Sequence, residues 1–246
     1  MKDRLFFCHI PKTGGTSLRN ALEATYQPWQ VLPDEFMMAR LGGRYADLVP
    51  MVHVYREARD AVRLVRAHWH ISCASLFDAS SAVILRDPYE RTVSHLRNIL
   101  RHGEISRPRL AQMLSRGALP IPDNVQARFL AGSVGPFDHQ LYERHIALLF
   151  GPRSSRCQLL DEALAGLEKT DFVGTTEALD VLAGDLGKAL GMPVVLESQN
   201  TSESDNLELD ANAEELIREN CAIDFALYDA AKKRMQPHPS KSGGAA

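Results

Sequence analysis

The sequence contains few cysteines. Its 246 residues include four, which are far apart, form no CxxC pair and have no histidine at the spacing of a zinc finger. This pattern argues against a disulfide framework and gives no sign of a metal site. We therefore expect reduced, structural thiols and no bound metal. The four are Cys8, Cys73, Cys157 and Cys221.

A long apolar run is also lacking. No stretch approaches the roughly 20 apolar residues that span a bilayer. The first apolar run, which starts at Leu5, lacks the long hydrophobic region of a signal peptide. We expect a cytoplasmic protein without a transmembrane segment, and the sequence leaves open a peripheral association with a membrane.

A large excess of one charge sign is absent too, because 28 lysines and arginines face 31 acidic residues, for a net charge of -3. The charges are nevertheless unevenly spread. Residues 40–109 hold twelve arginines against seven acids, and residues 161–229 hold seventeen acids against three bases. The first region could bind an anion. The acidic region is most simply a solvated helical surface, and it argues against a nucleic-acid partner, which needs a broad basic face.

The sequence does contain an alternation of short apolar runs and helical patterns. Residues 5–10, 82–85 and 172–174 each fit a buried parallel strand that leads into an amphipathic helix. Residues 62–67 fit either a further strand or an amphipathic helix, and we favour the strand. The alternation predicts an α/β fold, with a single-domain parallel sheet flanked by helices.

The other segments complete this domain, which we expect to cover residues 1–236. Residues 103–123 are polar and rich in proline, and they suggest an excursion over the surface. Residues 211–235 fit one long helix or two short ones. The composition of residues 237–246 predicts a disordered tail.

The first expected strand leads into a loop that suits an anion, in the sequence FFCHIPKTGGTSLRNAL. Gly14 and Gly15 permit a tight turn, and Thr16 and Ser17 open a helix, whose unpaired amides and dipole favour negative charge. Lys12 adds a full positive charge. A turn without a ligand is the simpler alternative, but it has no need of this lysine and the hydroxyls together. Because the lysine precedes the glycines, the loop is not a Walker A motif.

A second polar group follows the expected strand at 82–85, in the sequence VILRDPYERTVSHL. Arg86 stands at the end of the strand, and Asp87 begins a helix with a capping-box pattern. Ser94 lies on the second turn of that helix. A guanidinium and a hydroxyl placed in this way could bind the same oxyanion. The alternative is a structural ion pair between Arg86 and Asp87 or Glu90.

Together the two motifs resemble the sulfotransferases that use 3'-phosphoadenosine 5'-phosphosulfate (PAPS). The most similar group is the carbohydrate-type family, which includes heparan-sulfate 2-O-sulfotransferase and many bacterial members. The resemblance continues in DNVQARFLAG, FVGTTEALD and AIDFALYDAA, so it spans most of the chain. It implies a P-loop-NTPase-like sulfotransferase fold and PAPS as the co-substrate. By the same resemblance, the phosphosulfate would be bound by Lys12, Thr13, Gly14, Gly15, Thr16 and Ser17, and the 3'-phosphate by Arg86 and Ser94.

Two histidines follow the expected strand at 62–67, in the sequence VRAHWHISC. His68 and His70 lie on the same side of the chain if it stays extended. Members of the family place a Gly-His pair or a His-x-His here, so the resemblance implies His68 as the base, with His70 assisting or replacing it. Ala67 stands where relatives often have glycine, which leaves this register open. An imidazole with a pKa near ~6.5 suits a base at neutral pH.

The resemblance also implies a mechanism. An acceptor oxygen attacks sulfur in line, His68 takes the proton, and Lys12 with the loop amides stabilises the departing nucleotide. The resemblance alone implies the acceptor, which would be a hydroxyl of a glycan or glycolipid. Several arginines and one tryptophan could bind this acceptor, although the arginines could equally lie on the surface and the tryptophan in the core. They are Arg63, Trp69 and Arg128, with Arg40, Arg44, Arg56 and Arg59 in the same basic group.

Two other functions remain as alternatives. A nucleotide or small-molecule kinase of related fold would need a lysine after the glycines and a carboxylate for Mg²⁺, and neither is at the expected position. A non-catalytic module that binds PAPS or a nucleotide would not need both Lys12 and His68. The sequence does not specify the oligomeric state.

Overall fold

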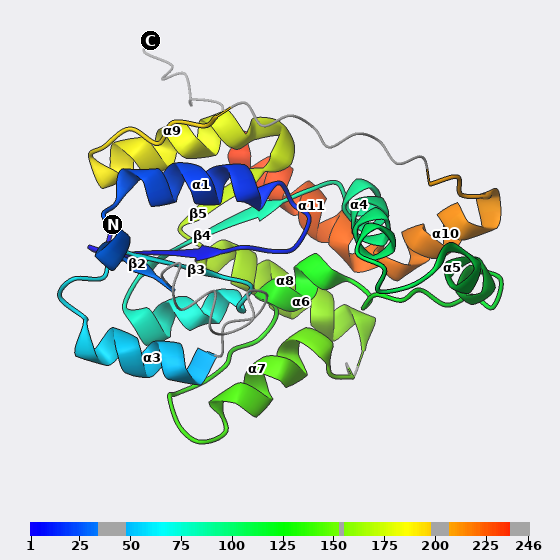
Figure 1. Ribbon diagram of the computed structural model, residues 1–246, viewed down its shortest axis with the longest axis horizontal. Helices are drawn as coiled ribbons and strands as arrows, with labels where there is room; N and C mark the ends of the chain where they lie inside the picture. The colour runs from blue at the N-terminus through cyan, green and yellow to red at the C-terminus, as the bar shows by residue number, and fades with distance from the viewer. Residues whose placement is uncertain (34–47, 153–154, 198–206, 237–246) are drawn as a thin grey trace, which may run out of the picture.

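The computed structural model describes residues 1–33, 48–152, 155–197 and 207–236. The predicted tail lies outside the described residues, as do Arg40 and Arg44. Within the described part, helices cover both faces of a central sheet (Figure 1).

Among the described residues, the central sheet has five strands, and all of its pairings are parallel. This finding confirms the predicted α/β fold, and it resolves the ambiguous segment 62–67 in favour of a strand. β1 lies at the centre of the sheet. The strand order is β2 (Val31–Leu32), β3 (Leu64–Ala67), β1 (Leu5–Cys8), β4 (Ser80–Leu85) and β5 (Phe172–Thr175).

The strands differ in places from the predicted bounds. β1 ends earlier than expected because the amide of Ile10 turns back to the carbonyl of Cys8, at 3.2 Å. β4 begins earlier than expected, at two buried serines, and Ser81 is accommodated there because its amide and hydroxyl both donate to the carboxylate of Asp171. The two-residue strand β2 was not predicted, because it is too short to show a period.

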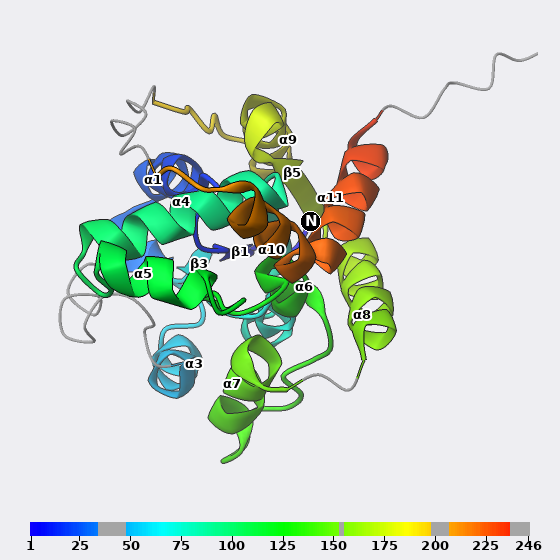
Figure 2. The ribbon, with the colours of Figure 1, turned by 90° about the vertical axis from the view of Figure 1, so that its right-hand side faces the viewer.

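The helices form layers around the sheet. α1 and α9 cover one face, α3, α6, α7 and α8 lie on the other, and α4, α5 and α10 lie beyond the carboxyl ends of the strands (Figures 1 and 2). The bounds are α1 (Gly15–Thr25), α3 (Leu48–Glu57), α4 (Pro88–Arg101), α5 (Arg107–Leu114), α6 (Val125–Leu130), α7 (Leu141–Phe150), α8 (Arg156–Lys169), α9 (Leu179–Leu190), α10 (Ala211–Asn220) and α11 (Ala222–Met235), with short 3₁₀ segments η1 (Pro28–Gln30), η2 (Ile71–Phe77) and η3 (Thr176–Ala178).

Side chains of β1 alternate between two cores, as the twofold period of a strand requires. Leu5 and Phe7 pack in the core formed with α1 and α9. Phe6 and Cys8 pack in the larger core on the opposite face. All four side chains are fully buried, so the carboxyl end of β1 is fixed from both sides.

A third core holds α4 beyond the edge of the sheet. Val93, Leu96 and Ile99 of α4 pack there with Leu110 of α5 and Ile217 of α10. The segment 103–123, predicted as a surface excursion, therefore contains a helix with a buried side chain. This packing fixes the helix that carries Ser94.

The C-terminal segment 211–235 forms two helices rather than one. α10 ends at Asn220, and Cys221 is both the C-cap of α10 and the N-cap of α11. The thiol of Cys221 lies 2.7 Å from the carbonyl of Ile217 in the third core. α11 then packs against α8 and β5.

Candidate functional site

A cavity of about 520 Å³ opens at the carboxyl edge of the sheet. It brings together the loop after β1, the residue after β3, the residue after β4 and one side of α4. In open parallel sheets this edge is the usual place for a ligand. The lining residues are His9, Pro11, Lys12, Gly14, Gly15, Thr16, Arg19, His68, Arg86, Ser94, His95, Asn98, His102 and Glu104.

The loop after β1 depends on its two glycines. Gly14 has a φ of 76° and is the N-cap of α1, with no side chain capping the helix, so the first amides of α1 have no side-chain cap. Gly15 leaves room for the ring of His9, because a Cβ at this position would lie 2.3 Å from His9 Cδ2. The loop therefore combines uncapped helix amides with a close-packed histidine.

Lys12 reaches across the cavity toward α4. Its Nζ donates a hydrogen bond to Asn98 Oδ1 at 3.3 Å. Burial lowers the pKa of Lys12, and the positive charges of Arg101 and Arg86 lower it further. Three cations thus act on one region, and an anion bound among them would relieve their mutual repulsion.

Arg86 lies beside the same loop. Its Nη1 donates to the carbonyl oxygen of Lys12 at 3.4 Å, and its Nη2 lies 3.7 Å from Glu90 Oε2. The structural pairing with Glu90 is therefore present, but Glu90 is largely exposed, and such pairs are weak. Asp87 accepts the amide of Glu90 at 3.0 Å and caps α4, as the sequence predicted.

His68 lines the cavity on the side of β3. Its Nδ1 donates a hydrogen bond to the carbonyl of His9, a bond that leaves the other ring nitrogen, Nε2, without a proton in the neutral ring. Burial lowers the pKa of His68, the bond to His9 opposes this, and the charges of Arg19 and Arg66 lower it further. The imidazole is therefore neutral at pH 7, as a proton acceptor must be.

His70 does not line the cavity. It is fully buried and caps η2, because its Nδ1 accepts the amide of Ser72 at 3.1 Å. Its Nε2 lies 3.0 Å from the carbonyl of Ala131. Both ring nitrogens thus have structural partners, because the chain turns into η2 at Ile71 instead of remaining extended.

Two residues of the predicted phosphate loop also lie outside the cavity lining. The hydroxyl of Thr13 is buried and donates to the carbonyl of Ile10 at 3.0 Å. Ser17 is half-buried on α1. The remaining loop residues that the sequence singled out, Lys12, Gly14, Gly15 and Thr16, all line it.

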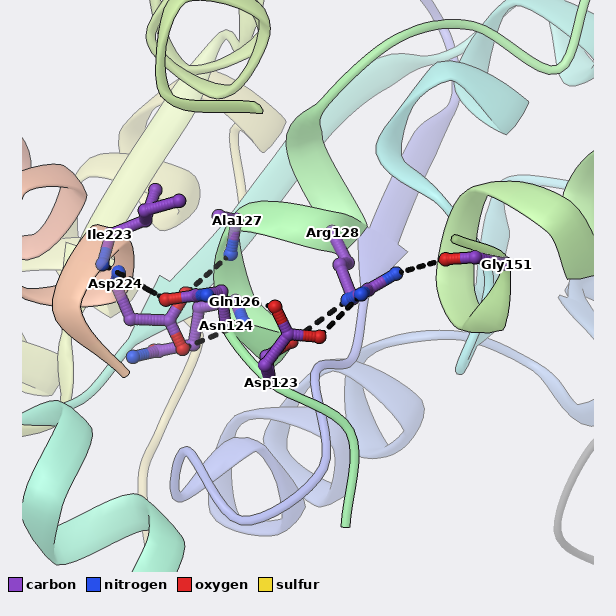
Figure 3. Close-up of polar contacts among 8 residues, drawn as sticks. All are labelled: Asp123, Asn124, Gln126, Ala127, Arg128, Gly151, Ile223 and Asp224. Carbon is purple, nitrogen blue, oxygen red and sulfur yellow. Dashed lines mark hydrogen bonds and ion pairs between the residues drawn. The ribbon is translucent and has the colours of Figure 1, made fainter. Parts of the chain in front are cut away.

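The predicted acceptor-binding side chains have other surroundings. Trp69 is buried and stacks on Phe77, with ring centroids 5.7 Å apart. Arg128 is buried, forms an ion pair with Asp123, and donates to the carbonyl of Gly151 at 2.8 Å (Figure 3). Trp69 is therefore a core tryptophan, and Arg128 has a structural role instead of lining the cavity.

Three arginines of the basic group lie elsewhere. Arg63 precedes β3, at the amino edge of the sheet, away from the cavity at the carboxyl edge. The guanidinium of Arg56 lies over the ring of Phe137, 4.2 Å from its centroid. Arg59 pairs with Asp78 at 3.2 Å. None of the three lines the cavity.

Sequence reasoning missed several cavity residues, namely Arg19, His102, Glu104, His9, His95 and Asn98. The last two follow Ser94 on α4 at positions that share one side of a helix, so the helical period could have found them. Arg91 Nη1 contacts His95 Nδ1 at 3.4 Å. Burial, then the charges of Arg91 and Lys12, lower the pKa of His95 to about 4.

The loop is tied to the rest of the sheet edge by a residue of η3. Thr176 Oγ1 lies 2.9 Å from the carbonyl of Thr13 and 3.3 Å from that of Leu85. A Cβ at Gly14 would lie 3.1 Å from Thr176 Cγ2. The segment FVGTTEALD thus helps to fix the loop against the end of β4.

The described residues contain no cluster of three or more His, Cys, Asp or Glu side chains arranged to hold a metal ion. None of their helices combines the length and the apolar character needed to cross a membrane.

Comparison with known proteins identifies the family of the chain. The model of the sulfotransferase family matches residues 1–232, while no curated protein matches the sequence. One similar solved structure is that of a sulfotransferase from Alicyclobacillus acidocaldarius, at 17% identity and a TM-score of 0.45, covering 94% of this chain and 95% of that chain. Because the family model covers nearly the whole sequence, the chain belongs to the sulfotransferase family.

Proposed function

We propose that this protein transfers a sulfuryl group from PAPS to an acceptor hydroxyl. The observation that carries the proposal is that Lys12, Arg86, Ser94 and His68 line one cavity, although they come from three separate strand ends and a helix. The family supports sulfuryl transfer in general. The donor, the acceptor and the roles of the residues are the proposed part.

We expect the cavity to bind a nucleotide with phosphate groups at both ends of its ribose. The amides at the start of α1 and the ammonium of Lys12 would hold the phosphosulfate. Arg86 and Ser94 would hold the 3'-phosphate, because a guanidinium and a hydroxyl can share a phosphate. The two cations lie close together, since Arg86 contacts the backbone of Lys12.

The proposed reaction uses groups that are already oriented. His68 would accept the proton of the acceptor hydroxyl at Nε2, since its Nδ1 is bonded to the His9 carbonyl. The acceptor oxygen then forms a bond to sulfur as the bond between sulfur and the oxygen of the 5'-phosphate breaks. Lys12 would stabilise the charge that develops on that oxygen.

We propose a glycan or glycolipid hydroxyl as the acceptor, on the strength of the family resemblance. The basic and aromatic side chains predicted to bind it are outside the cavity or outside the described residues, so the acceptor rests on the resemblance alone. Arg19 does line the cavity, where its charge acts on His68, and we propose it as a contact for the acceptor beside its ion pair with Glu23.

A sulfuryl-transfer assay tests the proposal. The protein is incubated with ³⁵S-labelled PAPS and with separate glycans, glycolipids, phenols and peptides, and the products are separated and counted. We expect label in a product with one acceptor class, and at least about 10²-fold slower labelling with His68→Ala. Binding of the nucleotide without transfer to any acceptor would favour a non-catalytic module, and phosphate transfer from ATP would favour a kinase.

A further inference from the structure

We infer that Gln126 is a positioning residue for Arg86: its side-chain amide holds the backbone of Arg86 so that the guanidinium can select a 3'-phosphate. This inference rests on the proposed function and adds a residue to it. Gln126 is outside the cavity lining and belongs to α6, where the sequence had singled out Arg128 but not Gln126.

The side-chain amide of Gln126 forms hydrogen bonds with both the backbone N–H and the backbone carbonyl of Arg86. Its Oε1 accepts the Arg86 amide at 2.9 Å, and its Nε2 donates to the Arg86 carbonyl at 2.9 Å. The ladder between β4 and β5 ends one residue earlier, where Leu85 pairs with Thr175. Gln126 therefore continues, for one residue, the pairing that a strand would have supplied.

Gln126 is itself held in place by hydrogen bonds between α6 and α11. The carboxylate of Asp224 accepts the backbone amides of Gln126 and Ala127 at 3.1 and 2.7 Å, and Asn124 Oδ1 accepts the amide of Ile223 at 2.9 Å (Figure 3). The starts of α6 and α11 thus cap each other. All of these polar groups are buried, so Gln126 has little freedom to move.

The side chain of Arg86 has weaker restraints than its backbone. The guanidinium contacts the Lys12 carbonyl at 3.4 Å and the exposed carboxylate of Glu90 at 3.7 Å. Both are longer than a strong charge-assisted bond. The place where the guanidinium enters the cavity therefore depends mainly on the backbone that Gln126 holds, and small displacements of such a group reduce binding.

Two variants separate positioning from simple stability. Gln126→Met keeps the length of the side chain and removes both hydrogen bonds, whereas Gln126→Glu keeps an acceptor for the Arg86 amide and loses the donor to its carbonyl. Gln158→Met is the matched control, because Gln158 is exposed on α8. Circular dichroism and thermal unfolding establish that each variant is folded.

The experiment measures by calorimetry the Kd values of 3'-phosphoadenosine 5'-phosphate and of adenosine 5'-phosphate. We expect both Gln126 variants to reduce the preference for the 3'-phosphate by about tenfold, as loss of a well-placed charged hydrogen bond does. Affinity for adenosine 5'-phosphate should stay within about twofold, and Gln158→Met should match the wild type.

Each outcome either supports or overturns the positioning role of Gln126. An unchanged preference in the variants, or an equal loss of affinity for both nucleotides, would overturn the positioning role while leaving the proposed function intact. No preference in the wild type would instead overturn the donor assignment, and the inference with it. If Gln126→Met does not fold, the same comparison is made with Gln126→Glu.

Discussion

The guanidinium of Arg86 donates a hydrogen bond to the carbonyl oxygen of Lys12 at 3.4 Å, across 74 residues of sequence. This contact is possible because β1 and β4 are neighbours in the sheet and run parallel, so that the residues after them meet at one edge. Because this bond uses the backbone of Lys12, the Lys12 ammonium, which donates to Asn98, keeps further N–H donors for a ligand.

The first prediction concerns the charge of Lys12. Lys12→Ala should lower kcat by about 10²-fold or more, because it removes the cation nearest the proposed leaving oxygen. Steady-state sulfuryl transfer at saturating PAPS measures the effect. Lys188→Ala, which removes an exposed lysine of α9, should leave kcat unchanged. A Lys12 variant with the wild-type kcat would remove this residue from the mechanism.

The second prediction concerns the pH dependence of activity. Because the pKa of His68 is lowered, mainly by burial, the neutral base should persist below pH 6.5. The value of kcat/KM should therefore be full at pH 7 and fall only as the pH drops through an apparent pKa below 6.5. His68→Ala should lower kcat/KM by about 10²-fold or more and abolish this acid limb.

The exposed His139 supplies the control for His68, because His139→Ala should keep both the rate and the profile. A profile whose acid limb survives in His68→Ala would show that another group sets it. His70→Ala should lower Tm and leave the profile unshifted, since it removes the cap of η2 and the contact with the carbonyl of Ala131.

The third prediction compares two glycines that differ in their surroundings. Gly15→Ala should strongly reduce activity, because its Cβ would lie 2.3 Å from His9 Cδ2, and the ring of His9 lies 4.6 Å from that of His68. Gly184→Ala, in the interior of α9 with nothing within 4 Å, should keep activity and stabilise the protein by about 0.5–1 kcal/mol. Activity assays and thermal unfolding test both. Full activity in Gly15→Ala would contradict the packing described for the loop.

The fourth prediction concerns stability in acid. Burial lowers the pKa of His145 to about 4, below its unfolded value near ~6.5. The unfolded chain therefore binds more protons between these values, so the contribution of His145 to stability is full above pH 6.5 and is lost as the pH falls toward about 4.

His145→Gln tests this contribution, because glutamine can still accept the backbone amide of His70, which His145 Nε2 accepts at 3.2 Å. The decrease in Tm from pH 7 to pH 4 should be smaller in this variant than in the wild type. His139→Gln should show the wild-type decrease. Parallel curves for wild type and His145→Gln would mean that His145 does not titrate on unfolding in this range.

Local motifs allowed much of the site to be predicted. The glycines, Lys12, Arg86 and Ser94 lie within short segments whose spacing alone indicates a strand end followed by a helix. The strand-helix alternation then predicted a parallel sheet, which places the ends of its strands at one edge. Both steps depend only on neighbours in sequence and on a general rule of α/β sheets.

The other features of the site could not be predicted, because they depend on where the chain turns and on contacts between residues distant in sequence. His68 and His70 are equivalent only if the segment stays extended, and the turn into η2 buries the second of them. Trp69 and Arg128 looked available for an acceptor because nothing local indicates their buried partners. Gln126 contacts Arg86 across 40 residues, so a motif without the fold could not assign it a role.

The central claim is that Lys12 and Arg86 bind the two phosphate ends of one nucleotide. Titration calorimetry of 3'-phosphoadenosine 5'-phosphate and adenosine 5'-phosphate into wild type, Arg86→Ala and the exposed control Arg116→Ala tests it most directly. We predict that the wild type and Arg116→Ala bind the first nucleotide about 10- to 100-fold more tightly, and that Arg86→Ala binds the two equally. Equal affinity of the wild type for both nucleotides would contradict the claim.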